Sequence, residues 1–402
     1  MAGRMEEGKL LLAMFERAVE LAHPARALAG RLPEPPRGRT FVAAFGKAAA
    51  SMARVVEDAW PTGAPMSGLA VTRYGHGTPL ERIELIEAAH PVPDRRSREA
   101  AGRVLAEAGR LGPDDLLLAL VSGGGSSLMV EPLDGITLEE KQAVNGALLR
   151  SGAPIGAMNA VRRHMSAIKG GRLAQAASPA LVRSYAISDV PGDDPATIAS
   201  GPTVGDPTTL ADAFDVLDRY AIDVAPHVRE AMRETPKSVA GEFTMIATPD
   251  DVVAEVAKEF EARSLGAGIE GEARDIGRDH AALALAGMRG ERIVSGGETT
   301  VTIDGPGGRG GRNVEYLLSL AIHLDGAPVH AIACDTDGID GSEDNAGAMI
   351  GPDTLARARS LGLDAQACLD GHDAYTFFER LGDLVVTGPT RTNVNDFRAI
   401  LT

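Results

Sequence analysis

The segment Asp115–Val121, D-L-L-L-A-L-V, most narrows the folds open to this chain. A strand that is apolar on both sides of its pleat is usually buried on both faces of a parallel sheet covered by helices. Strand-like and helix-like stretches alternate around it, with strands predicted at Thr40–Phe45 and Ile83–Ala88 and helices at Leu138–Arg150 and Ala157–Ala177. This alternation predicts an α/β fold with a Rossmann-like, mainly parallel sheet and helices on both faces.

Chain length and a change in composition predict two domains. The chain has 402 residues, whereas α/β domains usually have about 150–250. Composition turns polar at Glu234–Gly241, E-T-P-K-S-V-A-G, and new strand-like stretches follow at Phe243–Ala247, Ile293–Val294 and Thr299–Ile303. We therefore expect a first domain over 1–238 and a second, smaller α/β domain over 239–402.

Charge and aromatic content exclude several partners. Lys and Arg number 40 against 56 Asp and Glu, a formal charge of −16, and only 4% of residues are aromatic. An acidic chain repels phosphate backbones and lacks aromatic platforms for single strands, so we expect no nucleic-acid partner. An anionic small substrate would need a local basic pocket.

Hydropathy and cysteine spacing indicate the absence of a membrane span and of a disulfide framework. No apolar run approaches the length of about 18 residues that a membrane span needs, so we expect no membrane partner. The two cysteines, Cys334 and Cys368, have no metal or disulfide spacing and are typical of a reducing compartment. We therefore expect a cytoplasmic protein. The oligomeric state is open, with a homodimer as one option.

The run Ser188–Thr203, S-D-V-P-G-D-D-P-A-T-I-A-S-G-P-T, does not resemble core sequence. It follows a strand-like stretch at Leu181–Ile187, and ligands of open α/β sheets bind at the carboxyl ends of strands. Its clustered carboxylates, among them Asp189 and Asp193, indicate a site for a metal or a polar substrate. The alternative is an acidic, solvated turn.

Two further segments suggest anion binding. The loop Ser122-Gly123-Gly124-Gly125-Ser126-Ser127 follows the apolar strand, and consecutive N–H groups in such a loop form an anion nest. Lys47 follows the strand Thr40–Phe45 in what we expect to be the first turn of a helix over Lys47–Glu57. There it opposes the helix dipole, which makes sense if it faces a transferring phosphoryl group. A tight turn and a surface lysine are the alternatives.

The second half carries polar loops of the same kind. Gly305–Asn313, G-P-G-G-R-G-G-R-N, contains G-x-G-x-x-G between a strand and a helix, the context of dinucleotide sites, yet no clear ribose-binding acid follows. Arg312 at the helix start suggests an anion instead. Asp335–Gly341 fails as a calcium loop but offers a carboxylate, such as Asp337, to Mg²⁺. Ser295–Thr299 and Thr387–Asp396 are weaker polar loops. The basic segments at 159–164 and 168–172 lie in helical sequence and form either a basic rim or a solvated helix face.

Taken together, these segments resemble the glycerate 2-kinase family, the class II glycerate kinases whose C-terminal half is called the MOFRL domain. The matches run in order along almost the whole chain. They are F-G-K-A at 45–48, H-P-V-P-D at 90–94, S-G-G-G-S-S at 122–127, N-A-V-R-R-H-M-S-A-I-K-G-G-R-L-A at 159–174, the run 188–203, S-G-G-E-T-T at 295–300, G-R-G-G-R-N at 308–313, D-T-D-G-I-D-G at 335–341 and T-G-P-T-R-T-N-V-N-D at 387–396.

The resemblance implies two α/β domains, the second a mixed MOFRL-type domain, with the active site in the cleft between them. It implies transfer of the γ-phosphoryl group of ATP to the 2-hydroxyl of D-glycerate, with Mg²⁺. The family's two central basic residues fall on Lys47 and Arg312. We assign Asp189 to catalysis, with Asp193 and Asp337 as metal ligands. Substrate and nucleotide contacts are expected from Ser122, Gly123, Gly124, Gly125, Ser126, Ser127, Gly296, Gly297, Glu298, Asn313 and Asn395.

The chain departs from the family pattern at two places. It has Gly371-His372-Asp373 where Asn-Asn-Asp is usual, and Ala157 where a glutamate is common. Substrate specificity differs if either position touches the substrate. The rival enzyme hypothesis is an NAD(P)H-dependent hydroxypyruvate reductase that uses the loop 305–310, because some family members carry that label. A non-catalytic alternative is a regulator that binds a polyanion or a metabolite.

Overall fold

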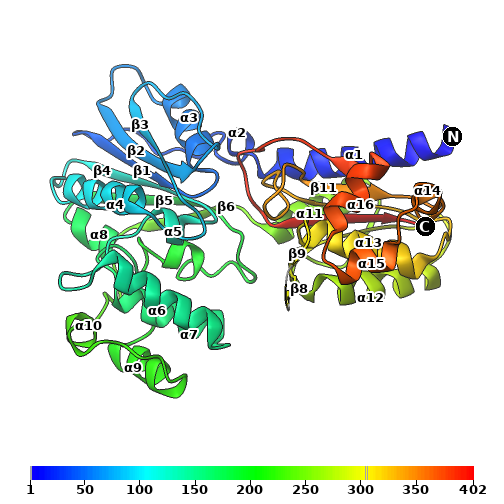
Figure 1. Ribbon diagram of the computed structural model, residues 1–402. Helices are drawn as coiled ribbons and strands as arrows, with labels where there is room; N and C mark the ends of the chain where they lie inside the picture. The colour runs from blue at the N-terminus through cyan, green and yellow to red at the C-terminus, as the bar shows by residue number, and fades with distance from the viewer. Residues whose placement is uncertain (1, 304, 306) are drawn as a thin grey trace. The chain divides into compact units, whose positions relative to one another are not determined.

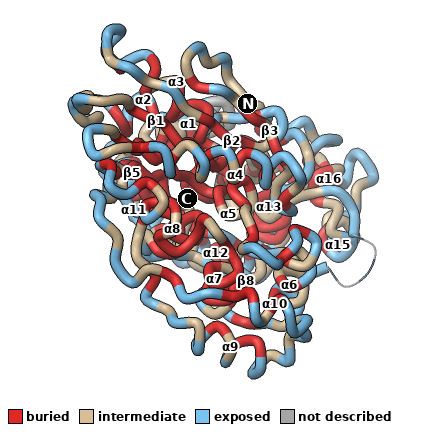
Figure 2. Tube along the Cα trace, turned by 90° about the vertical axis from the view of Figure 1, so that its left-hand side faces the viewer, coloured by how far each residue is buried: buried red, intermediate tan, exposed pale blue. Residues whose placement is uncertain are grey.

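The computed structural model describes residues 2–303, 305 and 307–402 of the chain. These residues form two compact units (Figure 1). The first unit is Pro24–Ile246, and the second combines the N-terminal segment up to His23 with Ala247–Thr402. Each unit has its own sheet and its own buried core. In Figure 2 the buried colour lies mainly inside the trace and the exposed colour mainly along its outer loops.

The first unit is built on a six-stranded sheet with the order β3-β2-β1-β4-β5-β6. Strands β3, β2, β1, β4 and β5 pair in parallel, and Phe45 at the end of β1 lies opposite Val121 at the end of β4. The strands are β1 (Thr40–Phe45), β2 (Met66–Arg73), β3 (Ile83–Ala88), β4 (Leu116–Val121), β5 (Leu181–Ile187) and β6 (Glu242–Ala247). The expected parallel α/β sheet is confirmed, and its strand order is that of the Rossmann fold.

Helices cover both faces of this sheet. The buried residues of α4 and α8 share one core with Phe41, Ala43 and Phe45 of β1, whereas α3 packs on β1 outside that core. The helices of the unit are α2 (Pro24–Ala27), α3 (Ala49–Ala59), α4 (Arg95–Ala108), α5 (Gly125–Leu128), α6 (Leu138–Arg150), α7 (Ile155–His164), α8 (Arg172–Ala177), α9 (Leu210–Arg219) and α10 (Pro226–Ala231). A 3₁₀ turn lies at Ile198–Ser200.

Four of these helices form a separate lobe. Figure 1 shows α6, α7, α9 and α10 grouped away from the strands, and they enclose a second core. Val144 and Leu148 of α6, Val161 of α7 and Leu217 of α9 belong to it. The lobe therefore places α6 and α7 beside the sheet as an independently packed layer.

The second unit has a mixed sheet with the order β12-β11-β10-β13-β9-β7, and β8 also pairs with β9. Its strands are β7 (Arg263–Ser264), β8 (Ile269–Glu272), β9 (Arg292–Thr300), β10 (His330–Asp335), β11 (Gly347–Ile350), β12 (Leu384–Val385) and β13 (Asp396–Leu401). Strand β13 lies antiparallel between β9 and β10, whereas β7 and β8 run parallel to β9. The second unit is therefore α/β with a mixed sheet, as expected.

Helix α13 (Arg312–Leu324) is the central helix of this unit. It is buried along most of its length and packs against α12 (Ala273–Ala286) and β10. The remaining helices are α1 (Ala2–Ala22), α11 (Pro249–Glu259), α14 (Thr354–Ser360), α15 (Ala365–Asp370) and α16 (Ala374–Leu381).

The grouping of the chain differs from the expected division at residue 238 in two respects. Helix α1 packs against β10, α11 and β13 of the second unit, and the Phe15 ring lies 6.5 Å from the Phe397 ring. Strand β6, which the sequence analysis assigned to the second domain, extends the first sheet, and its Phe243 and Met245 pack on the first core. Apolar faces, rather than the polar stretch at 234–241, determine the grouping.

Three expected elements have different bounds. The helix expected over 157–177 is two helices, because Gly170 and Gly171 take positive φ values of 59° and 82° between them. Helix α3 begins at Ala49, so Lys47 precedes it. The separate strands expected at 293–294 and 299–303 are one strand, β9, which runs through Gly296 and Gly297.

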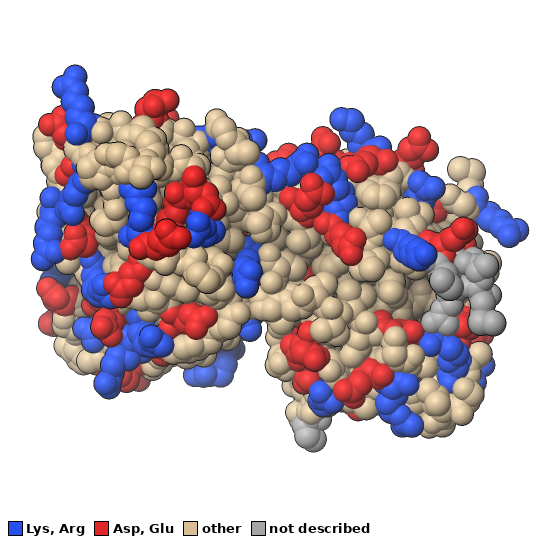
Figure 3. Space-filling model, turned by 90° about the horizontal axis from the view of Figure 1, so that it is seen from above, with Lys and Arg blue, Asp and Glu red and all other residues tan. Residues whose placement is uncertain are grey.

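Surface charge is mixed. On the face drawn in Figure 3, Lys and Arg side chains lie interspersed with Asp and Glu over each unit. Among the described helices, none is both long and apolar enough to cross a bilayer.

Helix α1 supplies a test of the division into units. We expect Phe15→Ala to lower the stability of the second unit by about 3–5 kcal/mol, because it leaves a large cavity in a buried contact. Trp60, the single tryptophan, lies in the first unit. In urea, the circular-dichroism midpoint should therefore fall more than the tryptophan-fluorescence midpoint. Met288→Ala, at a side chain that is 78% exposed, is the control. A fluorescence midpoint that falls as far as the circular-dichroism midpoint would contradict the grouping.

Candidate active site

The turn after β1 lies very close to the turn after β4. Gly46 has a φ of 125°, and a Cβ atom there would lie 2.2 Å from the Ser122 Oγ atom and 2.4 Å from the Ser122 carbonyl oxygen. A side chain at position 46 is therefore excluded by both the backbone angle and the contact. Glycine at this position lets the two turns meet.

Lys47 is held by these two turns. Its main-chain N–H donates to the Gly123 carbonyl at 2.8 Å, and the next N–H, of Ala48, donates to the Ser122 hydroxyl at 3.0 Å. Lys47 lies before α3 rather than in its first turn, so the helix-dipole argument does not apply. Its Cγ atom lies 3.4 Å from the point where a Gly124 Cβ atom would stand.

These two turns lie where the strand order of the sheet reverses direction. Strands β1 and β4 are neighbours, whereas β2 and β3 extend the sheet on one side and β5 and β6 on the other. In open α/β sheets, ligands bind outside the carboxyl ends of the strands at this switch point. The structure therefore brings Lys47 and the loop 122–127 together at the expected place for a ligand.

Within the loop 122–127, some residues support the fold and others line a cavity. Ser122 is buried and its hydroxyl accepts the Ala48 N–H, while the Gly123 carbonyl accepts the Lys47 N–H. Gly124, Ser126 and Ser127 line a cavity. Gly125 packs so tightly that a Cβ atom would lie 2.8 Å from the Ala199 Cβ atom.

The acidic loop 188–203 forms a wall next to the glycine loop. Its Ala199 and Ser200 have left-handed φ values of 51° and 62°, and the Ser200 Oγ lies 3.0 Å from the Ser126 Oγ. Non-glycine residues in this region cost about 1–3 kcal/mol each and cluster at functional sites. Asp189 and Asp193, both half-buried, follow the end of β5 in this loop.

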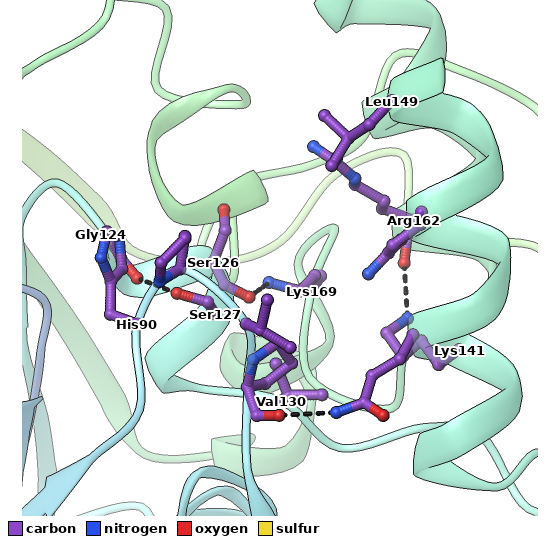
Figure 4. Close-up of a pocket in the computed structure, with 15 residues that line it drawn as sticks. His90, Gly124, Ser126, Ser127, Val130, Lys141, Leu149, Arg162 and Lys169 are labelled. Atoms are coloured by element: carbon purple, nitrogen blue, oxygen red, sulfur yellow. Dashed lines mark hydrogen bonds between the residues drawn. The ribbon is translucent and has the colours of Figure 1, made fainter. Parts of the chain in front are cut away.

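The cavity beside the loop has a volume of about 340 Å³. Figure 4 shows His90, Gly124, Ser126 and Ser127 on one side and Lys141, Leu149 and Arg162 on the other, with Lys169 between them. Its lining is His90, Pro91, Val92, Pro93, Gly124, Ser126, Ser127, Val130, Lys141, Gln142, Asn145, Gly146, Leu149, Arg162 and Lys169. It therefore combines the loops after β3 and β4 with helices α6 and α7.

Sequence reasoning missed Lys141 and Asn145, and it treated Arg162 and Lys169 as a basic rim. A signal was present. Lys141 lies on the same helical face as Leu138, Val144 and Leu148, all of which are buried. A lysine on an apolar helix face is unusual and indicates a buried cation that needs a partner.

Two neighbouring basic residues have structural roles. Arg163 forms an ion pair with buried Asp206, at 2.9 Å. His164 is fully buried, with its Nδ1 2.8 Å from the Ala160 carbonyl and its Nε2 3.2 Å from a Glu234 carboxylate oxygen. Both side chains are therefore used within the fold.

In the second unit, Arg312 is the centre of an acidic cluster. Its Nε, Nη1 and Nη2 atoms donate to Asp396 at 2.8 Å, Glu298 at 2.6 Å and Asp335 at 2.9 Å. Burial opposes the charge, but the three carboxylates outweigh it and hold the pKa of Arg312 well above its usual value. The guanidinium is thus fixed in direction and permanently charged.

The start of α13 already holds a carboxylate. Asp340 accepts the main-chain N–H groups of Asn313 at 3.0 Å and Val314 at 2.9 Å. Burial raises the pKa of Asp340 to about 6, against the lowering effect of these two N–H groups. Asn313 is also buried and donates to Asp396 at 2.8 Å. A ligand anion would therefore meet the Arg312 side chain rather than the helix N-terminus.

Other predicted residues of this unit lie in or beside the sheet. Gly296 and Gly297 are inside β9, and a Cβ atom on Gly297 would lie 2.1 Å from the Ile269 carbonyl oxygen of β8. These glycines permit strand pairing and do not form the expected loop. Asn395 is buried, and its carbonyl accepts the Thr336 N–H at 3.0 Å. Asp337 is buried next to it, after the end of β10.

The G-x-G-x-x-G segment lacks the context that a dinucleotide site requires. Strand β9 ends at Thr300 and α13 begins at Arg312, so the connection is long rather than a tight turn. Strand β13 lies antiparallel between β9 and β10, which breaks the parallel βαβ unit. Pro306 of this segment lies outside the described residues.

The metal prediction rests on single carboxylates. Over residues 2–303, 305 and 307–402, no group of three or more His, Cys, Asp or Glu side chains is arranged to hold a metal ion. Mg²⁺ that arrives with a nucleotide needs only one or two protein carboxylates and keeps several waters. Asp193 and Asp337 belong to different units and stay predictions as ligands.

The contact between the two turns can be tested. We expect Ser122→Ala to lower the free energy of unfolding by about 1–3 kcal/mol, because the buried Ala48 N–H loses its acceptor. Urea unfolding followed by Trp60 fluorescence measures it. Ser67→Ala, at an exposed position of the same unit, should change stability by less than about 0.5 kcal/mol. Equal effects of the two substitutions would contradict this role for Ser122.

Comparisons with known proteins are consistent over the whole chain. A domain of unknown function, DUF4147, matches residues 10–233, and the MOFRL family matches residues 291–396. A protein from Agrobacterium vitis, provisionally named a hydroxypyruvate reductase, is 53% identical over 98% of this chain and 94% of its own. D-glycerate 2-kinase from Thermotoga maritima is 39% identical over 96% of each chain.

A solved structure agrees with the sequence matches. The crystal structure of glycerate kinase from Thermotoga maritima covers 99% of this chain and 99% of its own, with a TM-score of 0.89 and 37% identity. The sequence comparison and the structure comparison thus both match this chain to glycerate kinases over nearly its whole length. The chain belongs to the glycerate 2-kinase family, whose C-terminal part is the MOFRL domain.

Proposed function

We propose that this protein is a glycerate 2-kinase, which transfers the γ-phosphoryl group of ATP to the 2-hydroxyl of D-glycerate and forms 2-phosphoglycerate and ADP. The observation that carries the proposal is Lys47, held against the glycine loop at the switch point of the first sheet, in a chain similar over its whole length to D-glycerate 2-kinase. A phosphoryl group in flight carries charge on three oxygens, and a fixed cation beside a loop of N–H groups suits that charge.

In this mechanism the 2-hydroxyl oxygen attacks the γ-phosphorus, the bond to the bridging oxygen breaks, and ADP leaves. Asp189 accepts the hydroxyl proton from its position after β5. Lys47 offsets negative charge on the transferring phosphoryl group. Gly124, which has no side chain, lets that group approach the main chain. Protein groups thus supply positioning and electrostatics, which are the main contributions to phosphoryl transfer.

Arg312 is proposed as the second cation. Asp335 and Asp396 are buried and orient its guanidinium, whereas the Glu298 side chain is 48% exposed. A phosphate or carboxylate oxygen of a ligand could take the place of the Glu298 carboxylate at Nη1. The contacts with Asp335 and Asp396 would meanwhile keep the guanidinium plane in its orientation. Asn313 and Asn395 support this cluster.

Mg²⁺ is proposed to arrive bound to ATP, with Asp337 and Asp193 as candidate ligands. Carboxylate oxygens are the donors that Mg²⁺ prefers. Asp337 lies two residues after Asp335 in the loop that follows β10, and its carboxylate is the candidate donor from the second unit. When bound, Mg²⁺ would offset charge on the phosphates.

The activity is tested with purified protein, D-glycerate and Mg·ATP, coupled to enolase without phosphoglycerate mutase. A signal is expected, since enolase consumes 2-phosphoglycerate directly. A parallel assay supplies hydroxypyruvate and NADH. NADH oxidation there, with no enolase signal, would replace the kinase proposal by the reductase.

Lys47→Ala is expected to lower kcat by on the order of 10²-fold or more, because one preorganised positive charge is lost from the transition state. The same coupled assay measures it. Lys258→Ala removes a lysine whose side chain is 80% exposed and should leave kcat unchanged. Near-normal turnover of the Lys47 variant would remove this residue from the mechanism.

Arg312→Lys should also lower kcat, by on the order of 10²-fold. An ammonium group lacks the planar fork that bonds three carboxylates at once, so the cation loses its fixed direction. Arg309→Lys is the matched control in the same loop, because Arg309 is half-exposed and pairs with Glu343 and Glu379. Equal turnover of the two variants would show that the orientation of Arg312 is unimportant.

The cytoplasmic location and the oligomeric state stay predictions from the sequence. The two cysteines are free thiols, as a reducing compartment would leave them.

A further inference from the structure

The cavity beside the glycine loop contains buried positive charge. Lys141 is 1% exposed and Lys169 is 3% exposed. The Lys141 Nζ donates to the Arg162 carbonyl at 3.1 Å, and the Lys169 Nζ donates to the Ser126 carbonyl at 2.6 Å. Figure 4 shows these side chains facing the same cavity. Together with Arg162, three basic side chains are thus gathered in one small space.

No carboxylate within the described ranges forms an ion pair with Lys141, Arg162 or Lys169. The next residue along α7, Arg163, does have such a partner in Asp206. The Nε of Arg162 is buried without a hydrogen-bond partner. The fold therefore neutralises one neighbouring cation and leaves three in the cavity without a counter-charge.

This arrangement costs free energy in the empty protein. Burial, and then the charge of Arg162, lower the pKa of Lys141 to about 7. Burial, and then the charges of Lys141, Arg162 and Arg163, lower the pKa of Lys169 well below its usual value. Charges buried without a partner destabilise a fold, and a bound anion would return that free energy.

Other lining groups indicate what kind of anion fits. Asn145 lies one helical turn from Lys141, and its Oδ1 is buried with no hydrogen-bond partner among the residues that the structure describes. That oxygen needs a donor, which a hydroxyl supplies and an ionised phosphate does not. Val130 and Leu149 add an apolar surface for a short carbon chain. At about 340 Å³, the cavity lies near the lower end of the range for small-molecule sites, about 300–1,000 Å³.

We propose that this cavity is the acceptor site, in which Lys141, Arg162 and Lys169 bind the carboxylate of the hydroxy acid and Asn145 accepts a hydrogen bond from one of its hydroxyl groups. The assignment of that acid as D-glycerate rests on the proposed function. Gly124 borders both this cavity and the Lys47 side chain, so an acid bound here lies next to the proposed phosphoryl position.

Binding without turnover tests the site independently of the kinase activity. D-glycerate, glycerol, inorganic phosphate and Mg·ATP are titrated separately into the full chain by calorimetry, for the natural protein and Lys141→Met. D-glycerate should bind and glycerol should not. Lys141→Met should weaken D-glycerate by about 10- to 100-fold, the effect of one hydrogen bond to a charged group, and leave Mg·ATP unchanged. Arg150→Gln removes an exposed cation from the same helix and is the control.

Thermal unfolding separates binding from a structural role. Lys141→Met should leave the Tm unchanged or raise it, because a buried basic group without a carboxylate partner is replaced by an apolar side chain of similar length. A second variant, Asn145→Asp, places a carboxylate four residues from Lys141 on one helix face. It should raise the Tm and abolish D-glycerate binding, because the protein then carries its own counter-ion.

The outcomes are distinct. Weakened phosphate and Mg·ATP binding with normal D-glycerate binding would assign the cavity to the nucleotide and overturn the proposal. Unchanged D-glycerate binding in both variants would overturn it as well. D-glycerate binding that Lys141→Met weakens, in a protein that produces no 2-phosphoglycerate, would support this site while the proposed function fails.

Discussion

The contact between Gly46 and Ser122 is the constraint on which the first unit depends. It joins the turns after two neighbouring strands so tightly that a Cβ atom has no room. Three consequences follow from it: Lys47 bonds to the glycine loop, the Ala48 N–H has a buried acceptor, and Gly124 stands between Lys47 and the cavity. A single atom of extra volume at position 46 would separate all of these groups.

The cavity of the first unit and the Arg312 cluster of the second unit surround their basic side chains in opposite ways. In the second unit, Arg312 has three carboxylate partners, more than one positive charge needs. In the first, Lys141, Arg162 and Lys169 share carbonyl and amide oxygens only. Several carboxylates around one cation fix its position, whereas basic groups without carboxylate partners leave a positive potential that attracts an anionic ligand. The net charge of −16 conceals this difference completely.

Much of the first sheet was predictable from the sequence. Strands β1, β3 and β5 and helix α6 have the bounds that hydrophobic patterning predicted, because each is bordered by turn residues and is apolar enough to define its own ends. The second sheet was harder to predict. Its short strands β7 and β12 and the glycines inside β9 gain their structure from neighbours distant in sequence, and local patterns do not carry that information.

The site shows the same limit. Lys47, the glycine loop and Arg312 stood out because glycine and basic residues at strand ends have few structural uses. Lys141 was missed although a local signal was present, because it lies on one helix face with the apolar Leu138 and Leu148. The supporting roles of Ser122 and Gly123 depend on which strands are adjacent. For Ser122 and Gly123, spatial adjacency across the sheet was the missing information.

The position of α1 has a consequence for synthesis. The first unit is continuous in sequence, so it has all its strands once residue 246 has left the ribosome. Helix α1 is made before the first unit, yet its partner β13 is made after it. During translation, the apolar face with Leu11, Met14 and Phe15 must therefore wait until the whole first unit and β13 have been made. Nascent chains with such a face are those that chaperones shield and that aggregate when synthesis outruns folding.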